Sequence, residues 1–201
     1  MRPRLVIMLK EPVAGRVKTR LGRDIGMTAS AWWFRNQSAG TIRCLQSPRW
    51  ETWLAVAPDT ALNARCWPAH LPRMAQGLGD LGARMARILN NSKGPVVIIG
   101  GDILGIQQAH IAKAFRQLGQ NELVFGPATD GGFWLVGKRQ RVPRGLFENV
   151  RWSSPNTLQD TITSAGATNI GYAGTLSDID TAKDLKFIAR HSRAAQPEHK
   201  R

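Results

Sequence analysis

Short apolar runs alternate along this sequence with longer amphipathic stretches, and few folds accommodate that pattern. Residues 96–99 contain no polar side chain, as is typical of a strand covered on both faces. Strands that alternate with helices predict a three-layer α/β/α sandwich around a mostly parallel central sheet. The strands are predicted at residues 5–9, 52–57, 96–99, 123–125 and 133–136, and the helices at 28–45, 80–90, 107–118, 155–164 and 181–191.

The length and the charge limit the organisation and the partners. A chain of 201 residues can bury one core and is short for two, so we expect a single domain over residues 1–191 and a basic, flexible tail at 192–201. The formal net charge is +14, and residues 1–50 contain ten lysines or arginines but only Glu11 and Asp24 as acids. Cations gathered around one loop are more typical of a phosphate site than of a nucleic-acid track, although net charge alone leaves a nucleic-acid partner open.

Cysteine usage and hydropathy indicate the compartment. Cys44 and Cys66 form no CxxC pair, and no cysteine and histidine cluster has the spacing of metal ligands. Both are predicted to be buried thiols, and the lack of a disulfide framework is typical of a reduced, intracellular protein. The first apolar run is too short for a signal peptide, and no run reaches membrane-spanning length. We therefore expect a cytoplasmic protein of unknown oligomeric state.

The loop after the first predicted strand carries the strongest indication of a ligand. Gly15 interrupts residues 10–22, and the cations Arg16, Lys18 and Arg20 follow it at once. A buried strand holds such a loop in place, glycine lets the backbone approach a ligand, and cations with free amides neutralise an anion. The spacing matches neither standard glycine fingerprint, so a solvated basic turn is the alternative.

Two aspartates follow predicted strands, at the sheet edge where ligands bind in open sheets of this kind. Asp102 comes after an apolar run and two glycines, and a hard oxygen ligand there suits Mg²⁺ or Mn²⁺ beside bound phosphates. Its alternative role is to cap the next helix. Asp130 precedes two glycines whose amides could meet an acceptor, but Asp-Gly is also an ordinary hairpin turn. Trp134 suits either stacking on a ring or a place in the core.

Two further segments are candidates for ligand binding. Asp180 either caps the last predicted helix or supplies the second carboxylate that a divalent ion needs. The glycine-rich loop from Gln76 to Gly82 either holds a base or ribose through backbone groups, or is a flexible loop in which Asp80 caps the helix that follows. The histidines stand in no catalytic pairing and the serines lack a nucleophile elbow, which argues against covalent catalysis.

Together these segments resemble a bacterial family, DUF2064, whose members are described as glycosyltransferase-A-type or nucleotide-diphospho-sugar transferases. The resemblance runs from Leu5 to about Leu185, and the order and number of the motifs make it specific. The motifs are residues 10–21, 76–85, 100–102, 126–133, 147–153 and 178–185.

The family is similar to metal-dependent nucleotidyltransferases and nucleotide-sugar glycosyltransferases, including the guanylyltransferases of molybdopterin and of the deazaflavin cofactor. The resemblance implies a Rossmann-like GT-A fold and a Mg²⁺ or Mn²⁺ cofactor. It also implies transfer of a nucleotidyl or glycosyl group from a nucleoside triphosphate or nucleotide sugar. The acceptor, the base and the sugar stay open.

The resemblance also implies roles for single residues. Lys18 and Arg20 would hold the phosphates with support from Arg16, Lys18 and Asp102 would be catalytic, and Asp102 and Asp180 would bind the metal. The other implied contacts are Leu9, Lys10, Gly15, Gln76, Gly77 and Gly79 with the donor and Asp130, Gly131 and Gly132 on the acceptor side.

The chain departs from the family directly after Asp102. The family usually has a Cys-Pro pair there, whereas Ile103 and Leu104 follow in this sequence, so the turn lacks the constraint of a proline. Because of this altered turn and the high positive charge, a non-catalytic nucleic-acid-binding or regulatory module on the same fold is the alternative function.

Overall fold

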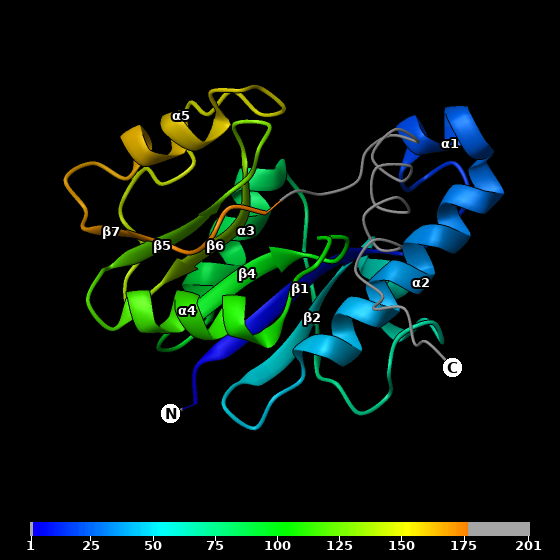
Figure 1. Cartoon of the computed structure of the whole chain (residues 1–201), viewed down its shortest axis with the longest axis horizontal. Helices are drawn as coiled ribbons and strands as arrows, with labels where there is room; N and C mark the ends of the chain where they lie inside the picture. Colours follow the sequence, from blue (N-terminus) through cyan, green and yellow to red (C-terminus); the bar gives the residue numbers. More distant parts are fainter. Residues whose placement is uncertain (1, 177–201) are drawn as a thin grey trace, which may run out of the picture.

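Seven strands form one sheet in the computed structural model, which describes residues 2–176 (Figure 1). They lie in the order β3-β2-β1-β4-β6-β5-β7. Every neighbouring pair is parallel except those of β6, which runs antiparallel to β4 and β5, so the prediction of a mostly parallel sheet is confirmed. The strands are β1 (Arg4–Lys10), β2 (Glu51–Ala57), β3 (Arg73–Ala75), β4 (Val96–Gly100), β5 (Leu123–Pro127), β6 (Phe133–Lys138) and β7 (Ile170–Tyr172).

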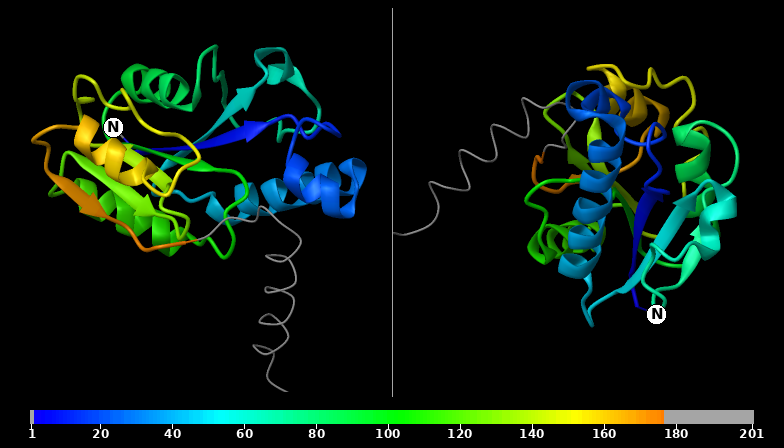
Figure 2. Two further views of the ribbon diagram at one scale, coloured as in Figure 1. Left: turned by 90° about the horizontal axis from the view of Figure 1, so that it is seen from above. Right: turned by 90° about the vertical axis from the view of Figure 1, so that its right-hand side faces the viewer.

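Helices cover both faces of this sheet and complete the three predicted layers (Figure 2). Side chains of α2 and α4 pack in one hydrophobic cluster, and those of α3 and α5 pack in another on the opposite face. The helices are α1 (Thr19–Ile25), α2 (Met27–Leu45), α3 (Leu81–Asn91), α4 (Gln108–Leu118) and α5 (Thr157–Ser164), and a 3-10 helix, η1, spans Asp59–Asn63.

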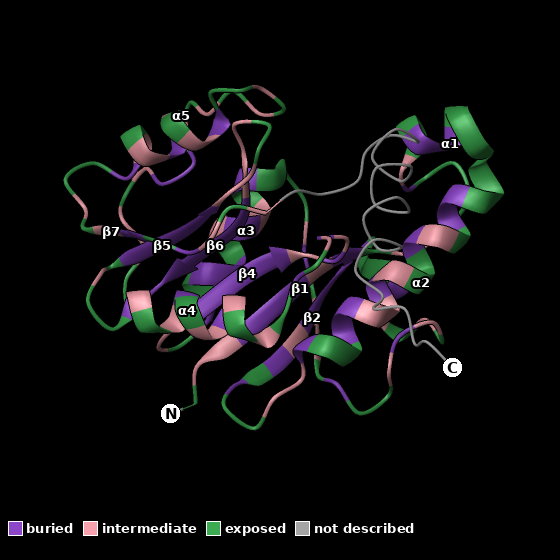
Figure 3. Ribbon diagram, viewed as in Figure 1, coloured by how far each residue is buried: buried purple, intermediate pink, exposed green. Residues whose placement is uncertain are grey.

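The central strand β1 supplies side chains to both clusters. Leu5 and Ile7 belong to the cluster under α2 and α4, and Val6 belongs to the cluster under α3 and α5. This distribution follows from the alternation of side chains along a strand. All three are fully buried, and Figure 3 shows the same burial across the middle of the sheet. The apolar composition of the predicted strands thus reflects a sheet covered on both sides.

Most predicted elements are confirmed with boundary shifts of one or two residues, whereas the shortest elements were missed. Helix α1, the 3-10 helix and the three-residue strands β3 and β7 are too short to show a period in the sequence. The predicted helix at 181–191 and the tail at 192–201 lie outside the described residues. No helix within residues 2–176 is long and apolar enough to cross a membrane.

The prediction that both cysteines are buried is wrong. Cys44 is exposed and Cys66 is half-buried. Helix α2 turns Thr41, Ile42 and Leu45 toward the sheet, and the helical period places Cys44 on the solvent side of that stripe.

Truncation of a core leucine should destabilise the protein strongly. Leu54 of β2 is fully buried, so Leu54→Ala removes packed methyl groups and leaves a cavity, at a cost of about 2–5 kcal/mol in the free energy of unfolding. Leu78→Ala is the matched control because Leu78 is 86% exposed, and its effect should stay within about 0.5 kcal/mol. Urea unfolding of both variants measures the difference, and equal effects would contradict the assigned core.

Candidate functional site

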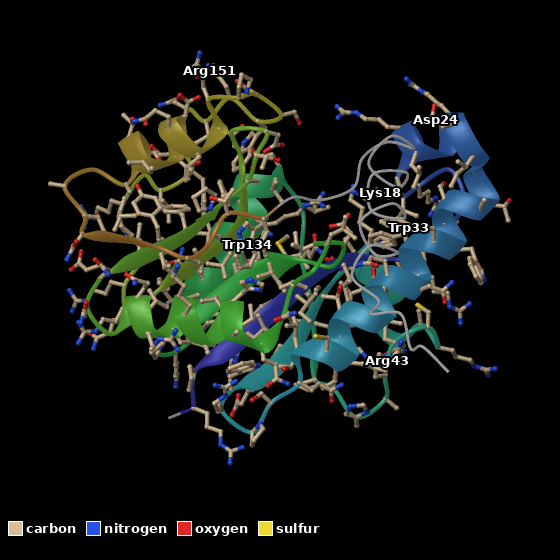
Figure 4. All side chains as sticks on the ribbon, in the orientation of Figure 1. Lys18, Asp24, Trp33, Arg43, Trp134 and Arg151 are labelled. Atoms are coloured by element: carbon tan, nitrogen blue, oxygen red, sulfur yellow. The ribbon has the colours of Figure 1, made fainter. Side chains whose placement is uncertain are left out.

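A cavity of about 700 Å³ opens beyond the carboxyl ends of β1 and β4. Its lining comes from the loop before α1, the loop before α3, the turn after β4, the β5–β6 turn and the segment before α5. Figure 4 labels one residue on each side of it, Lys18 beside α1 and Trp134 on β6. The sheet edge at which sequence analysis expects ligands is therefore hollow.

The first loop reaches this cavity through Lys18. Lys18 adopts the left-handed conformation, with φ of 44°, directly before α1. Few residues other than glycine and asparagine adopt that conformation, so it marks a position that the surrounding structure determines. Both Lys18 and Arg20 line the cavity, whereas Gly15 and Arg16 do not.

The ammonium group of Lys18 forms an ion pair with the carboxylate of Asp102. The distance between Lys18 Nζ and Asp102 Oδ2 is 2.7 Å, and the two side chains are only 10% and 19% exposed. An ion pair shielded from water in this way is stronger than one on the surface. The structure thus brings the two residues that the family resemblance implies to be catalytic into direct contact.

Asp102 lies in the turn after β4, where the chain passes close to β1. A Cβ at Gly101 would meet the buried side chain of Leu9, which would have to shift to make room for it. Asp102 does not cap the next helix, because α4 begins with Gln107 as its N-cap in a capping box with His110. The helix-cap alternative for Asp102 is therefore wrong, and its carboxylate faces the cavity paired with Lys18.

Gln76 holds the loop before α3 at the ends of two strands. The side chain is 3% exposed, and its amide nitrogen Nε2 donates hydrogen bonds to Leu9 O (3.0 Å) and Ala55 O (2.8 Å). Both partners are acceptors, so the amide orientation is determined by its hydrogen bonds. The backbone after it is held by Arg87, which donates to Gln76 O and Leu78 O.

The same loop also supplies the cap of the helix that follows, which confirms the alternative predicted for Asp80 from the sequence. Asp80 Oδ1 accepts a hydrogen bond from Ala83 N at 2.8 Å and caps α3. Asp80 nevertheless lines the cavity together with Gly79. Gly77 does not line it, because its amide donates to Asp59 Oδ1 outside the cavity. One loop therefore both starts a helix and forms a wall.

The turn between β5 and β6 forms the opposite wall. Asp130 Oδ1 accepts a hydrogen bond from Gly132 N at 2.9 Å, and β5 and β6 pair as an antiparallel hairpin, so the hairpin interpretation is confirmed. Asp130 and Gly132 line the cavity, whereas Gly131 packs against Pro155, where a side chain would clash. Trp134 is 4% exposed, and its Nε1 donates a hydrogen bond to Gly174 O. It is therefore a core residue that also lies at the margin of the cavity.

The segment before α5 also lines the cavity, and sequence analysis assigned it no role. Trp152 contacts Phe133 and Phe147 in an aromatic cluster, and Ser153 and Ser154 continue the wall. The motif at 147–153 belongs to the family resemblance, and its tryptophan and serine are the signal that could have placed it here.

An exposed ion pair anchors this segment. Arg151 donates to both carboxylate oxygens of Asp160, at 2.8 Å to Oδ2 and 2.9 Å to Oδ1. Hydrogen bonds from the Arg151 side chain and backbone lower the pKa of Asp160 to about 2. The pair joins the segment to the first turns of α5, and so helps to hold the wall that Trp152 forms.

The cavity collects most of the predicted site residues. Asp180 lies outside the described residues, so its role stays a prediction. The predicted residues that line the cavity are Leu9, Lys10, Lys18, Arg20, Gln76, Gly79, Asp102, Asp130 and Gly132, and those that do not are Gly15, Arg16, Gly77 and Gly131.

The described residues suit a metal ion held mainly by a bound phosphate ligand, and not one held by three or more protein side chains. Within residues 2–176 there is no group of three or more histidine, cysteine or acidic side chains that could hold a metal ion. Asp102 offers a carboxylate to the cavity next to Lys18, whose charge neutralises it. This donor set suits Mg²⁺ held mainly by substrate phosphates and water, which needs only one or two carboxylates.

Comparisons with known proteins agree with the fold and the motifs. The model of a family described as "Uncharacterized protein conserved in bacteria (DUF2064)" matches residues 41–154. That range includes Gln76, Asp102 and Asp130 but not the first loop, whose place at the cavity rests on the structure. No curated protein matches the chain.

Solved structures share the fold over nearly the whole chain. A proposed nucleotide-diphospho-sugar transferase from Desulfovibrio desulfuricans G20 has a TM-score of 0.83 at 24% identity, covering 98% of this chain and 90% of that one. CMP:2-keto-3-deoxy-manno-octonic acid synthetase complexed with CTP has a TM-score of 0.57 at 11% identity, covering 98% and 100%. Rv0371c from Mycobacterium tuberculosis H37Rv in complex with manganese has 0.52 at 14%, covering 94% and 99%. The chain therefore has the nucleotide-diphospho-sugar transferase fold.

The contribution of the Arg151–Asp160 pair to the stability of the folded protein should depend on pH. The folded-state pKa of Asp160 is below its ordinary value of 3.8, so the pair stabilises the protein above about pH 4 and loses this effect as the pH falls toward 2. The melting temperature of wild type should exceed that of Asp160→Asn at pH 7, and the gap should close toward pH 2. A gap that is constant over this range would contradict the assigned role of the carboxylate.

Proposed function

Because the chain belongs to the family described as uncharacterized protein conserved in bacteria (DUF2064), we propose that it is a transferase acting on a nucleotide donor. The donor is a nucleoside triphosphate or a nucleotide sugar, and the group transferred is a nucleotidyl or a glycosyl group. Neighbours of the same fold support this proposal, because one of them is a synthetase complexed with CTP.

The contact between Lys18 and Asp102 inside the cavity carries the proposal. It joins a cation of the first loop to a carboxylate at the end of β4, next to Arg20. Cations on one side of a carboxylate suit a polyphosphate, whose oxygens pair with lysine and arginine. The wall formed by Gln76 and Gly79 lies beside β1 and is the side that we assign to the base and ribose.

The reaction needs little covalent help from the protein. An oxygen of the acceptor attacks phosphorus or the anomeric carbon, and Lys18 and Arg20 stabilise the charge that develops on the leaving phosphates. The leaving group is pyrophosphate in nucleotidyl transfer and a nucleoside diphosphate in glycosyl transfer. When donor binds, the Lys18 ammonium exchanges the Asp102 carboxylate for a phosphate oxygen, which frees the carboxylate.

The freed carboxylate is the group that we assign to a divalent ion. Asp102, with Asp180 from outside the described residues, would hold Mg²⁺ or Mn²⁺, which when bound neutralises the donor phosphates. The manganese complex of a neighbour with the same fold supports this assignment. On the opposite wall, Asp130, Gly132 and Trp152 are the groups that we assign to the acceptor.

Removal of the Asp102 charge should strongly weaken metal-dependent donor binding. Thermal-shift screening against nucleoside triphosphates and nucleotide sugars should give a wild-type shift that requires both ligand and Mn²⁺. Asp102→Asn should lower the apparent affinity at least about tenfold, because the divalent ion loses a carboxylate ligand. Its own melting temperature should change little, because the asparagine oxygen still accepts from Lys18.

The control for this variant is Glu148→Gln, which removes an exposed carboxylate that does not line the cavity. Equal binding of the nucleotide panel by wild type and Asp102→Asn would contradict the metal assignment. Retention on duplex DNA or RNA at physiological salt, without any nucleotide shift, would instead favour the nucleic-acid-binding alternative.

Removal of the Lys18 charge should weaken the binding of the donor and strengthen the binding of Mn²⁺. Lys18→Met should weaken donor binding, because a phosphate loses its cation. It should strengthen the binding of Mn²⁺ to the protein alone, because the Asp102 carboxylate loses its internal partner. Titration of free Mn²⁺ by electron paramagnetic resonance measures the second effect. Lys113→Met, an exposed lysine on α4, is the matched control and should leave both affinities unchanged.

A further inference from the structure

A second cavity of about 400 Å³ lies between α2 and the segment at residues 65–70. Among residues 2–176, Phe34 of α2 is the one that lines both cavities, so the two are neighbours with otherwise separate lining residues. A volume of 300–1,000 Å³ is the usual size of a site for a small molecule. The proposed transferase reaction makes no use of this cavity.

The floor of the second cavity is apolar. Phe34, Ile42 and Trp67 are 6%, 2% and 6% exposed and offer aromatic and aliphatic surface. Trp67 is held in place by a hydrogen bond from its Nε1 to Ala61 O at 3.0 Å. Such a floor binds the apolar body of a ligand, because burial of apolar surface is favourable.

The rim of the second cavity is positively charged. Arg35, Arg43 and Arg65 line it, with Arg43 labelled on α2 in Figure 4, and no acidic residue among residues 2–176 does. None of their three guanidinium groups forms a hydrogen bond or ion pair within residues 2–176. Burial raises the pKa of the Cys66 thiol, and the Glu11 carboxylate raises it further, while Arg35 and Arg73 lower it. Unpaired guanidinium groups at a cavity favour an anionic ligand.

A buried hydroxyl without a partner belongs to the same wall. Ser38 of α2 is 2% exposed and lines the cavity, and its Oγ has no hydrogen-bond partner within the described residues. A buried polar atom without a partner is costly, so such atoms are rare in folded proteins. A ligand oxygen in the cavity would satisfy it. This observation is independent of the charge on the rim.

We propose that the second cavity is a binding site for a small organic anion, namely a carboxylate or phosphate monoester carried on an aromatic or aliphatic body. The anionic group pairs with Arg35, Arg43 and Arg65, and the body lies on Phe34, Ile42 and Trp67. The site stands independently of the proposed function, because apart from Phe34 it shares no lining residue with the main cavity.

Cys66 provides a local readout, because it lines the second cavity and is one of only two cysteines in the chain. In a Cys44→Ser variant it is the single thiol, and the neutral reagent iodoacetamide reports its accessibility. Phenyl phosphate should slow the alkylation of Cys66 at least fivefold at saturation. Phenol and inorganic phosphate, the two halves of the probe, should protect far less at equal concentration. A parallel series with benzoate separates a carboxylate ligand from a phosphate ligand.

Variants locate the protection. Arg43→Gln combined with Arg65→Gln should weaken the protection by phenyl phosphate at least tenfold, while Arg23→Gln, an exposed arginine of α1 outside both cavities, should not. Lys18→Met should also leave the protection intact, because Lys18 lines only the main cavity. Alkylation that neither phenyl phosphate nor benzoate slows would overturn the proposal, as would protection that survives the double arginine variant or disappears in Lys18→Met.

Discussion

Burial of β1 between β2 and β4 is the constraint on which the rest of the structure depends. The strand pairs in parallel with both neighbours and supplies side chains to both hydrophobic clusters. Its carboxyl end is therefore held in place by contacts on both edges and both faces. The first loop leaves from that end, and the Gln76 side chain is bonded to Leu9 O on the same strand. Both walls of the donor side are therefore placed by one buried strand.

The contact between Lys18 and Asp102 connects that strand to its neighbour β4. Parallel strands end at the same edge of a sheet, which is why a loop near residue 18 meets a turn near residue 102. The pair neutralises two mostly buried charges at the cavity. In the reaction that we propose, the donor exchanges this contact for new partners, so the same two side chains both order the empty site and affect its affinity for the donor.

The strand and helix pattern could be predicted from the sequence, because long elements repeat with a clear period and have an apolar face. The place of Lys18, Gln76 and Asp102 at one sheet edge could also be predicted, since charged and glycine-rich segments follow apolar runs directly. The elements β3, β7 and α1 could not, because their few residues show no period. Nor could the place of Trp152 at the cavity, because the contact of this ring with Phe133 joins segments far apart in the chain.

The sequence by itself determined the α/β class and the position of charge beside the first strand, because both depend on local order along the chain. Only the tertiary structure decided which groups meet. In the folded chain Lys18 pairs with Asp102, and Gly131 packs against Pro155 instead of lining the main cavity. Three arginines, two of them on α2, line a second cavity with an apolar floor. These outcomes depend on distances between segments that packing alone sets, and no local pattern encodes them.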